Sequence, residues 1–325
     1  MCTAITYKTK DHYFGRNLDM DYTYHEMVTI TPRYYPFHFR KMGTQLQHYA
    51  MIGIAYIVDD YPLYYDAVNE MGLGIAGLLF PQNAHYKEED SDKDNVPPFE
   101  FIPWILGQCA TVEEARKKLE RIRFLDLKFK ENLPQSHLHW MISDRESSIT
   151  VEALEEGVKV YDNPAGVMTN NPAFDIQLFN LNNYMRLSTE KPQNQFCANL
   201  PLEAYCVGMG AMGLPGDMSS MSRFVKAAFT KFNSVSDSSE SASISQFFHI
   251  LRSVELPRGC VQVGANRYEI TEYSSCCNVD KGIYYYTTYE NCQITGVDMY
   301  KEDIDGNRLI TYPLLKGQRV QMQNG

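Results

Sequence analysis

Three absences narrow the functions open to this 325-residue chain. Lysine and arginine number 30 against 40 aspartate and glutamate, and no basic cluster offsets the net charge of −10. Phosphate binding needs concentrated positive charge, so we expect no nucleic-acid partner. The N-terminus lacks the basic region followed by an apolar region that marks a secretory signal peptide. The longest apolar run, near residues 71–80, is about half as long as a membrane span. We therefore expect a cytoplasmic protein without a membrane partner.

Metal-ligand spacing is also missing. The eight cysteines are irregularly spaced without a Cys-x-x-Cys pair, and Cys276 directly precedes Cys277. His137 and His139 share an apparent strand that brings no acidic or cysteine ligand nearby. Structural zinc sites group thiolates and imidazoles at short spacing, so we predict no metal site and reduced cysteines.

The composition and the order of elements predict one α+β domain over residues 1–325. Hydrophobic residues make up 44% and charged residues 22%, as in ordinary globular proteins, and no repeat or domain boundary is apparent. Strand-like runs lie at residues 50–58, 72–79, 138–142, 148–154, 268–274, 283–289 and 293–299. Helices are predicted at residues 111–123, 222–232 and around 244–251. Strands, then helices, then strands favour two sheets with helices outside over alternating βαβ units.

Cys2 has the clearest chemical potential in the sequence, because it directly follows the initiator methionine. Aminopeptidases remove Met1 when the second residue is small. The mature chain would then begin with a residue that carries both a thiol, with a pKa of ~8.5, and an α-amine, with a pKa of ~7.7–8.0. That amine is partly unprotonated at neutral pH and can act as the base for its own thiol, as in enzymes with an N-terminal threonine.

The next residues predict a hairpin that brings ionisable groups to Cys2. Two strand-like segments, residues 2–8 and 13–19, flank a polar break. A turn centred in that break places Cys2 opposite Asp19 on one face, and Arg16 on the other face unless the strand bulges. The carboxylate would hold the amine, and the guanidinium would favour the thiolate. The plain alternative is a surface hairpin with an Arg–Asp ion pair.

Several sequence blocks, in order and at suitable spacing, resemble the choloylglycine hydrolase family, which contains bile salt hydrolases and penicillin V acylases. The blocks include Cys2-Thr3-Ala4-Ile5, Phe14-Gly15-Arg16-Asn17-Leu18-Asp19, Leu138-His139-Trp140-Met141-Ile142, Thr169-Asn170-Asn171-Pro172, Gly213-Leu214-Pro215-Gly216-Asp217 and Ser222-Arg223-Phe224. The resemblance implies the four-layer αββα sandwich of N-terminal nucleophile hydrolases. It also implies a homotetramer, and an amidase that needs no cofactor and cleaves bile salts conjugated to glycine or taurine.

The resemblance assigns roles to residues of the site. Cys2 is the nucleophile and its amine the base, with Asp19 orienting the amine and Arg16 favouring the thiolate. Arg223 supplies positive potential. On local grounds Arg223 would be a solvated side chain, because it lies opposite an apolar helical stripe and near the helix start, where the dipole disfavours cations.

The oxyanion of the tetrahedral intermediate is expected to bind the side-chain amide of Asn170 and the backbone N–H of Leu79. Bile salt hydrolases commonly carry asparagine where this chain has Leu79, and penicillin V acylases often tyrosine, so the preferred acyl group stays open. The Gly208-Met209-Gly210 loop has a form that accompanies preference for glycine conjugates. By family position, the residues expected to line an apolar pocket are Leu18, Val58, Tyr65, Phe129 and Leu133.

Other functions remain open at the level of sequence. A penicillin V acylase or another N-acyl amidase would use the same machinery. A papain-like protease could pair Cys109 with His139 or His249, but no flanking signature supports it. A steroid- or lipid-binding protein could retain the pocket without turnover, and retention of Met1 would favour that alternative.

Overall fold

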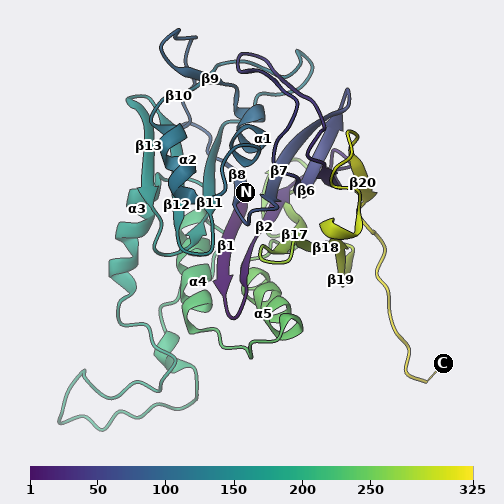
Figure 1. The fold of residues 1–325 in the computed structure, drawn as a ribbon. Coiled ribbons are helices and arrows are strands. Elements are labelled where there is room, and N and C mark those ends of the chain that lie inside the picture. Colours follow the sequence, from purple (N-terminus) through teal and green to yellow (C-terminus); the bar gives the residue numbers. More distant parts are fainter. Residues whose placement is uncertain (325) are drawn as a thin grey trace.

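The computed structural model describes residues 1–324 and consists of two large antiparallel sheets packed face to face (Figure 1). The six-stranded sheet has the order β14-β1-β2-β17-β18-β19. Its strands are β1 (Cys2–Lys8), β2 (His12–Met20), β14 (Val167–Met168), β17 (Ile270–Asn278), β18 (Ile283–Thr288) and β19 (Asn291–Asp298). Apolar side chains of both sheets interdigitate between them, among them Val28, Ile52, Val68, Met141 and Tyr273.

The eight-stranded sheet has the order β13-β12-β11-β8-β7-β6-β3-β20. Its strands are β3 (Met27–Thr31), β6 (Met51–Val58), β7 (Tyr61–Asn69), β8 (Gly74–Leu79), β11 (Leu138–Ser143), β12 (Ser148–Leu154), β13 (Gly157–Asp162) and β20 (Ile310–Pro313). The short pairs are β4 (Phe37–Phe39) with β5 (Gly43–Gln45), β9 (Asp94–Val96) with β10 (Ile122–Phe124), and β15 (Gln262–Gly264) with β16 (Arg267–Tyr268).

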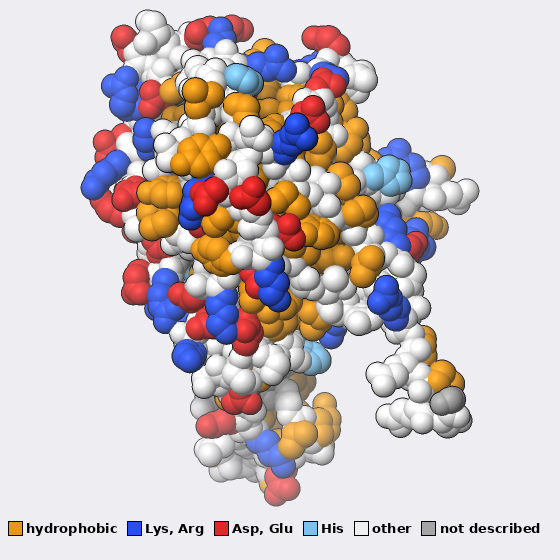
Figure 2. All heavy atoms as spheres, turned by 45° about the vertical axis from the view of Figure 1, so that its right-hand side comes forward, with side chains coloured by type: hydrophobic (Ala, Val, Ile, Leu, Met, Phe, Trp, Pro, Cys, Tyr) orange, Lys and Arg blue, Asp and Glu red, His pale blue; other side chains and the backbone are white. Residues whose placement is uncertain are grey.

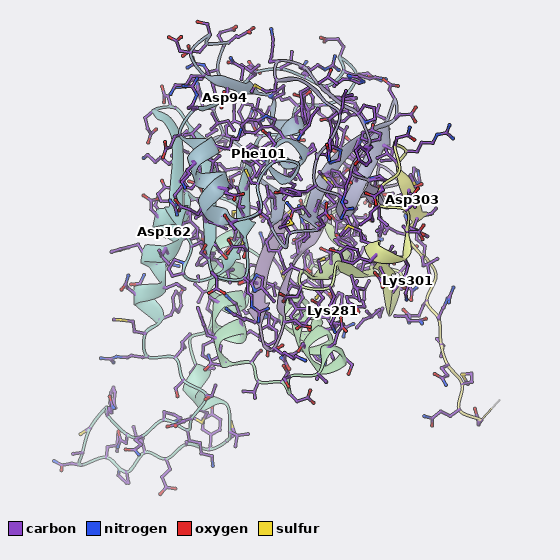
Figure 3. The ribbon with its side chains drawn as sticks, in the orientation of Figure 1. Asp94, Phe101, Asp162, Lys281, Lys301 and Asp303 are labelled. Carbon is purple, nitrogen blue, oxygen red and sulfur yellow. The ribbon has the colours of Figure 1, made fainter. Side chains whose placement is uncertain are left out.

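Helices cover the outer faces of both sheets. They are α1 (Phe101–Leu106), α2 (Val112–Leu119), α3 (Phe174–Asn180), α4 (Ser220–Asn233) and α5 (Glu240–Arg252). α1 and α2 pack on the eight-stranded sheet. Phe101, at the start of α1 (labelled in Figure 3), lies 4.7 Å from Trp140 between ring centroids. α4 and α5 pack on the six-stranded sheet, burying Phe224, Phe247 and Leu251. The predicted four-layer αββα fold is confirmed.

The register of the first hairpin differs from the prediction by one residue. Cys2 pairs with Leu18, not with Asp19, because three residues (9–11) link β1 to β2, where the Thr9 N–H bonds to the Asp11 carbonyl at 3.0 Å. Side chains alternate between faces along a strand. Arg16 therefore shares the face of Cys2, whereas Asp19 lies on the opposite face. Both face assignments from the sequence were wrong.

The helix boundaries also shift. The helix predicted at residues 111–123 begins as expected, with the Thr111 side chain accepting from the Glu114 N–H, but it ends at Leu119. Ile122 belongs to β10, which runs parallel to β9. α4 and α5 are longer than predicted at both ends, and they start earlier because Ser219 and Ser239 cap their first turns.

A long segment between α3 and α4, residues 185–216, projects from the body and carries only a short 3-10 helix (Met209–Ala211). Figure 2 shows this segment and the C-terminal residues as two protrusions from a body with dispersed charges. The segment carries several strongly exposed apolar side chains, among them Met185, Phe196, Tyr205, Val207 and Met212. Within residues 1–324, no helix has the length and apolarity that a membrane crossing needs.

Candidate active site at the amino terminus

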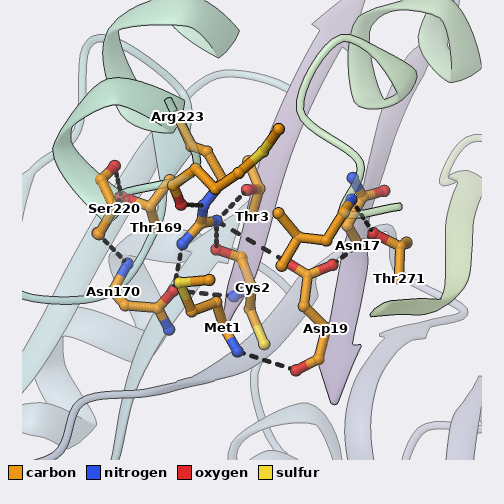
Figure 4. Close-up of polar contacts among 12 residues, drawn as sticks. Met1, Cys2, Thr3, Asn17, Asp19, Thr169, Asn170, Ser220, Arg223 and Thr271 are labelled. Carbon is orange, nitrogen blue, oxygen red and sulfur yellow. Dashed lines mark hydrogen bonds and ion pairs between the residues drawn. The ribbon is translucent and has the colours of Figure 1, made fainter. Parts of the chain in front are cut away.

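Cys2 begins β1 and is the centre of the site (Figure 4). Its side chain is 1% exposed and lines a cavity. Its backbone N–H donates to Asn170 Oδ1 at 2.8 Å. The Met1 amine donates to the Asp19 carbonyl oxygen at 2.9 Å and pairs with Glu269. If Met1 is removed, the Cys2 nitrogen becomes an amine beside the thiol, with Asn170 Oδ1 already in place as its acceptor.

Arg16 lies on the cavity face of β2, two residues from the partner of Cys2. Its side chain is fully buried, and Nη1 donates to the carbonyl oxygens of Gly77 and Tyr65. Burial lowers the pKa of Arg16, but nearby groups that can carry negative charge, Cys2 first among them, outweigh burial and raise it. Nη2 has no hydrogen-bond partner among residues 1–324. A permanent cation thus faces the cavity beside the thiol, as the expected role of Arg16 requires.

Asp19 contacts the amino terminus through its backbone rather than its carboxylate. Its side chain points to the opposite face of the hairpin, where Oδ1 accepts from Thr271 Oγ1 at 2.6 Å. Oδ2 lies 3.8 Å from Nη1 of Arg223. Burial raises the pKa of Asp19, while Arg223 and the N-terminal amine oppose that rise. The carboxylate is therefore placed to compensate the charge of Arg223.

Arg223 is buried, not solvated as its local sequence suggests. The first turn of α4 abuts the start of β1, so the side chain, 1% exposed, reaches under Cys2. Nη1 donates to the Cys2 carbonyl and to Thr3 Oγ1, and Nη2 donates to Asn170 Oδ1 at 2.8 Å. Burial lowers the pKa of Arg223, which Asp19 opposes. Arg223 thus fixes both the backbone of Cys2 and the orientation of the Asn170 amide.

The amide of Asn170 and the backbone of Leu79 meet at one edge of the site. Asn170 Nδ2 donates to the Leu79 carbonyl at 2.7 Å. The Phe80 N–H donates to the carbonyl of His137, the residue just before β11. Leu79 and its partner Leu138 therefore form a non-hydrogen-bonded pair between β8 and β11. The N–H and carbonyl of Leu79 both point away from β11, toward Asn170. The Asn170 amide and the Leu79 backbone thus lie side by side next to Cys2, where the family resemblance expects the two oxyanion donors.

The cavity has a volume of about 200 Å³. A single water molecule needs about 10–15 Å³ of such space, so the cavity is sufficient for an organic group of several carbon atoms. Four of the expected residues, Leu18, Tyr65, Phe129 and Leu133, line it, as does Leu79. A mainly apolar lining with a few polar groups at one end is typical of small-molecule sites.

Val58 lies outside this lining, at the end of β6 and next to the turn into β7. Tyr56, two residues earlier, lines the cavity instead and stacks on Tyr24 at 5.1 Å between ring centroids. Sequence reasoning missed both tyrosines and Phe99. β6 is apolar on both faces, so no alternation separates a cavity residue from a core residue there.

The alternative thiol, Cys109, is unsuited to nucleophilic attack. Burial raises its pKa to about 11, and it does not line the cavity. His139 is engaged by Glu152, and His249 is exposed on α5. Within residues 1–324, no three His, Cys, Asp or Glu side chains form a group that could hold a metal ion.

Comparison with known proteins identifies the family. The model of the linear amide C–N hydrolases, choloylglycine hydrolase family, matches residues 2–312. The chain belongs to this family. Choloylglycine hydrolases act on linear amide C–N bonds, so the chain is a hydrolase and the resemblance drawn from its sequence blocks is confirmed.

Characterised choloylglycine hydrolases match along nearly the whole chain. The bile salt hydrolase/transferase of Lactiplantibacillus plantarum is 56% identical over 97% of both chains. That of Clostridium perfringens is 40% identical over the full length of both. A solved structure of the C2A mutant of the conjugated bile acid hydrolase from Clostridium perfringens superposes with a TM-score of 0.92 at 39% identity and full coverage of both chains. The penicillin V acylase of Agrobacterium tumefaciens, at 20% identity and a TM-score of 0.77 over 97% of this chain and 92% of that one, shares the fold.

Proposed function

We propose that this choloylglycine hydrolase cleaves the amide bond of glycine- or taurine-conjugated bile salts, with Cys2 as the nucleophile. The observation that carries the proposal is the Cys2 thiol in an apolar cavity, beside the Arg16 cation and next to the Asn170 amide, which donates to the Leu79 carbonyl. The similarity to bile salt hydrolases over nearly the full chain supports the choice of substrate.

The first half of the reaction forms an acyl-thioester. The Cys2 thiol gives its proton to the α-amine exposed by loss of Met1, and the sulfur, its developing negative charge stabilised by Arg16, attacks the amide carbonyl. The carbonyl oxygen becomes an oxyanion that accepts hydrogen bonds from Asn170 Nδ2 and the Leu79 N–H. Collapse of this intermediate breaks the C–N bond, and the α-amine returns the proton to the departing glycine or taurine nitrogen.

Water completes the reaction. The α-amine accepts a proton from water as the oxygen attacks the thioester carbonyl, and the same two donors hold the second oxyanion. Collapse then releases the free bile acid and restores the thiol. Asp19 acts from the far face of the hairpin: its carboxylate compensates Arg223, which in turn holds the Asn170 amide.

A panel of amides tests the proposal: glycocholate, taurocholate, penicillin V and an acyl-homoserine lactone, with release of the amine product measured. We expect the bile salts to be cleaved fastest, and Cys2→Ala to be inactive with an unchanged fold. A variant that retains Met1 should also be inactive, because its Cys2 nitrogen is an amide. Full activity with Met1 present would overturn the proposed role of the amine.

A penicillin V acylase, or another N-acyl amidase, is the second candidate. Leu79 keeps it open, because bile salt hydrolases commonly carry asparagine at this position and penicillin V acylases often tyrosine, and this chain has neither. Faster cleavage of penicillin V than of either bile salt in the same panel would support this candidate.

We further propose that residues 1–325 act as one domain, and that the protein is a cytoplasmic homotetramer, as the family resemblance implies. Sedimentation equilibrium measures the assembly directly. A non-catalytic steroid- or lipid-binding protein would instead retain Met1 in an intact-mass measurement and bind bile salts without releasing an amine.

A further inference from the structure

A buried histidine–glutamate pair lies behind the proposed oxyanion donors and has no part in the mechanism above. His139 on β11 and Glu152 on β12 are cross-strand partners, with Nδ1 and Oε1 3.1 Å apart. Their side chains are 2% and 0% exposed. Burying two ionisable groups costs several kcal/mol unless each is well compensated. A pair held so deeply requires a physical reason.

The hydrogen bonds fix where the protons lie. His139 Nε2 is 2.8 Å from the Thr169 carbonyl oxygen, which can only accept, so Nε2 carries a hydrogen. Glu152 Oε1 also accepts from the Phe174 N–H at 3.0 Å. Glu152 thereby keeps the Nε2 hydrogen aimed at Thr169.

The imidazole ring contacts the chain neighbours of both oxyanion donors. Thr169, which accepts from Nε2, directly precedes Asn170. Phe80, which directly follows Leu79, stacks on the ring with centroids 4.2 Å apart and an interplanar angle of 6°. One rigid side chain therefore touches the two segments that carry the two donors.

We infer that His139, oriented by Glu152, is a positioning residue that fixes the Asn170 amide and the Leu79 N–H relative to each other. This inference rests on the proposed function. His139 does not line the cavity, so it acts through Thr169 and Phe80 rather than on the substrate. The donors gain their effect from being preorganised, and a shift of a few tenths of an ångström in either weakens the transition state more than the bound substrate.

Two variants that differ by one methylene group test the inference. In His139→Gln the side-chain amide can extend to the position of Nε2 and donate to Thr169, whereas in His139→Asn it stops near Nδ1 and cannot. Both leave Glu152 without its imidazole partner. We expect His139→Asn to lower kcat about tenfold or more with KM within about twofold, less than the about 10²–10³ of deleting a donor outright. His139→Gln should recover most of that loss.

A second buried histidine supplies the matched control. His12 lies at the far end of β2 from Asp19, is 4% exposed, and contacts Ser143 Oγ at 3.3 Å. His12→Gln and His12→Asn should have equal kcat, close to that of the parent. Rates are divided by the number of reactive Cys2 thiols, so a loss of folded protein does not register as a loss of kcat.

A double-mutant cycle separates this inference from the proposed function. Because His139 acts through both donors, His139→Asn should lower kcat clearly less in the Asn170→Ala background than in the parent, since only the Leu79 N–H is left to displace. Multiplicative losses, equal kcat for His139→Gln and His139→Asn, or an effect on KM alone would each overturn the positioning role. An Asn170→Ala variant with unchanged kcat would instead overturn the proposed oxyanion site itself.

Discussion

At the residue scale, the proposed reaction gives Leu79 two separate functions, one for its backbone and one for its side chain. Its N–H is the proposed oxyanion donor, whereas its side chain belongs to the wall of the proposed acyl cavity. The oxyanion is common to every amide, and the acyl group is where amides differ. The backbone of Leu79 should therefore govern rate, and its side chain should govern preference.

Leu79→Asn tests this division. The backbone donor remains and a polar group enters the cavity wall, so we expect the ratio of bile-salt to penicillin V cleavage to change about tenfold. The kcat for the better substrate should stay within about threefold. The panel of amides described above measures both quantities. An equal depression of all substrates would show that the side chain is needed for the chemistry itself.

Asn170→Ala should behave in the opposite way. It removes a donor that every substrate uses, so kcat should fall about 10²–10³-fold for all of them. Asn171→Ala is the control, because the neighbouring amide donates outward to the Pro81 carbonyl. If Asn170→Ala changed the substrate ratio instead, the roles of the two donor positions would be exchanged.

At the scale of elements, α4 and α5 begin in the same way but differ in what their first turns carry. Ser219 accepts from the Ser222 N–H at 3.4 Å, and Ser239 accepts from the Ala242 N–H at 3.3 Å. The first turn of α4 contains Arg223, and that of α5 contains no residue of the site.

Ser219→Ala and Ser239→Ala therefore form a matched pair. Each loses a helix cap, and each should lower the free energy of unfolding by about 1 kcal/mol. Only Ser219→Ala should also lower kcat several-fold, because Arg223 moves with its turn. Urea unfolding and steady-state kinetics measure the two effects. A kcat loss in Ser239→Ala of the same size would mean that general loosening, not Arg223, is responsible.

The elements were predictable where periodicity was clear and unpredictable where it was not. The capping pair of Thr111 and Glu114 marked the start of α2, but the apolar Ile122 extended the predicted helix into β10. β7 was not predicted, because the charged residue Asp66 interrupts its apolar pattern. In the fold this carboxylate is buried and accepts a hydrogen bond from the Tyr273 hydroxyl. Pairs such as His139 with Glu152 leave no local signal, since only the sheet register brings them together.

At the scale of the whole molecule, the αββα layers follow from the order of strands and helices together with the family resemblance. The site could not be predicted from the order of elements, because its residues come from β1, β2, β8, α4 and the segment after β14. The resemblance named Cys2, Asn170 and Arg223, which the fold does bring together. It could not give the faces of Arg16 and Asp19, which depend on a turn length that polar residues alone do not determine.

The pH dependence of stability should contain a contribution from His12. Burial lowers its pKa from 6.5 to about 4. Between those values the unfolded chain binds a proton that the folded chain does not, so stability falls as the pH falls from 6.5 toward 4. The full difference corresponds to about 3 kcal/mol.

His12→Gln should remove this contribution to the pH dependence. The free energy of unfolding of the variant, relative to that of the parent, should therefore be higher at pH 4.5 than at pH 7. Urea midpoints at the two pH values measure it. Glu100 opposes the trend in both proteins, because burial raises its pKa to about 7 and its contribution is lost as the pH rises from 4.5 through 7. A parallel pH profile for parent and variant would contradict the role of His12.

The three-residue turn between β1 and β2 has a consequence for how this chain can change over time. Substitutions at Thr9, Lys10 or Asp11 leave the pairing of Cys2 with Leu18 intact. Insertion or deletion of a single residue there would exchange the two faces of β2. Asp19 would then face the cavity, and Arg16 would face away from it. The residues of the turn can therefore be substituted during evolution as long as its length stays at three. Selection would act against insertions and deletions in this turn.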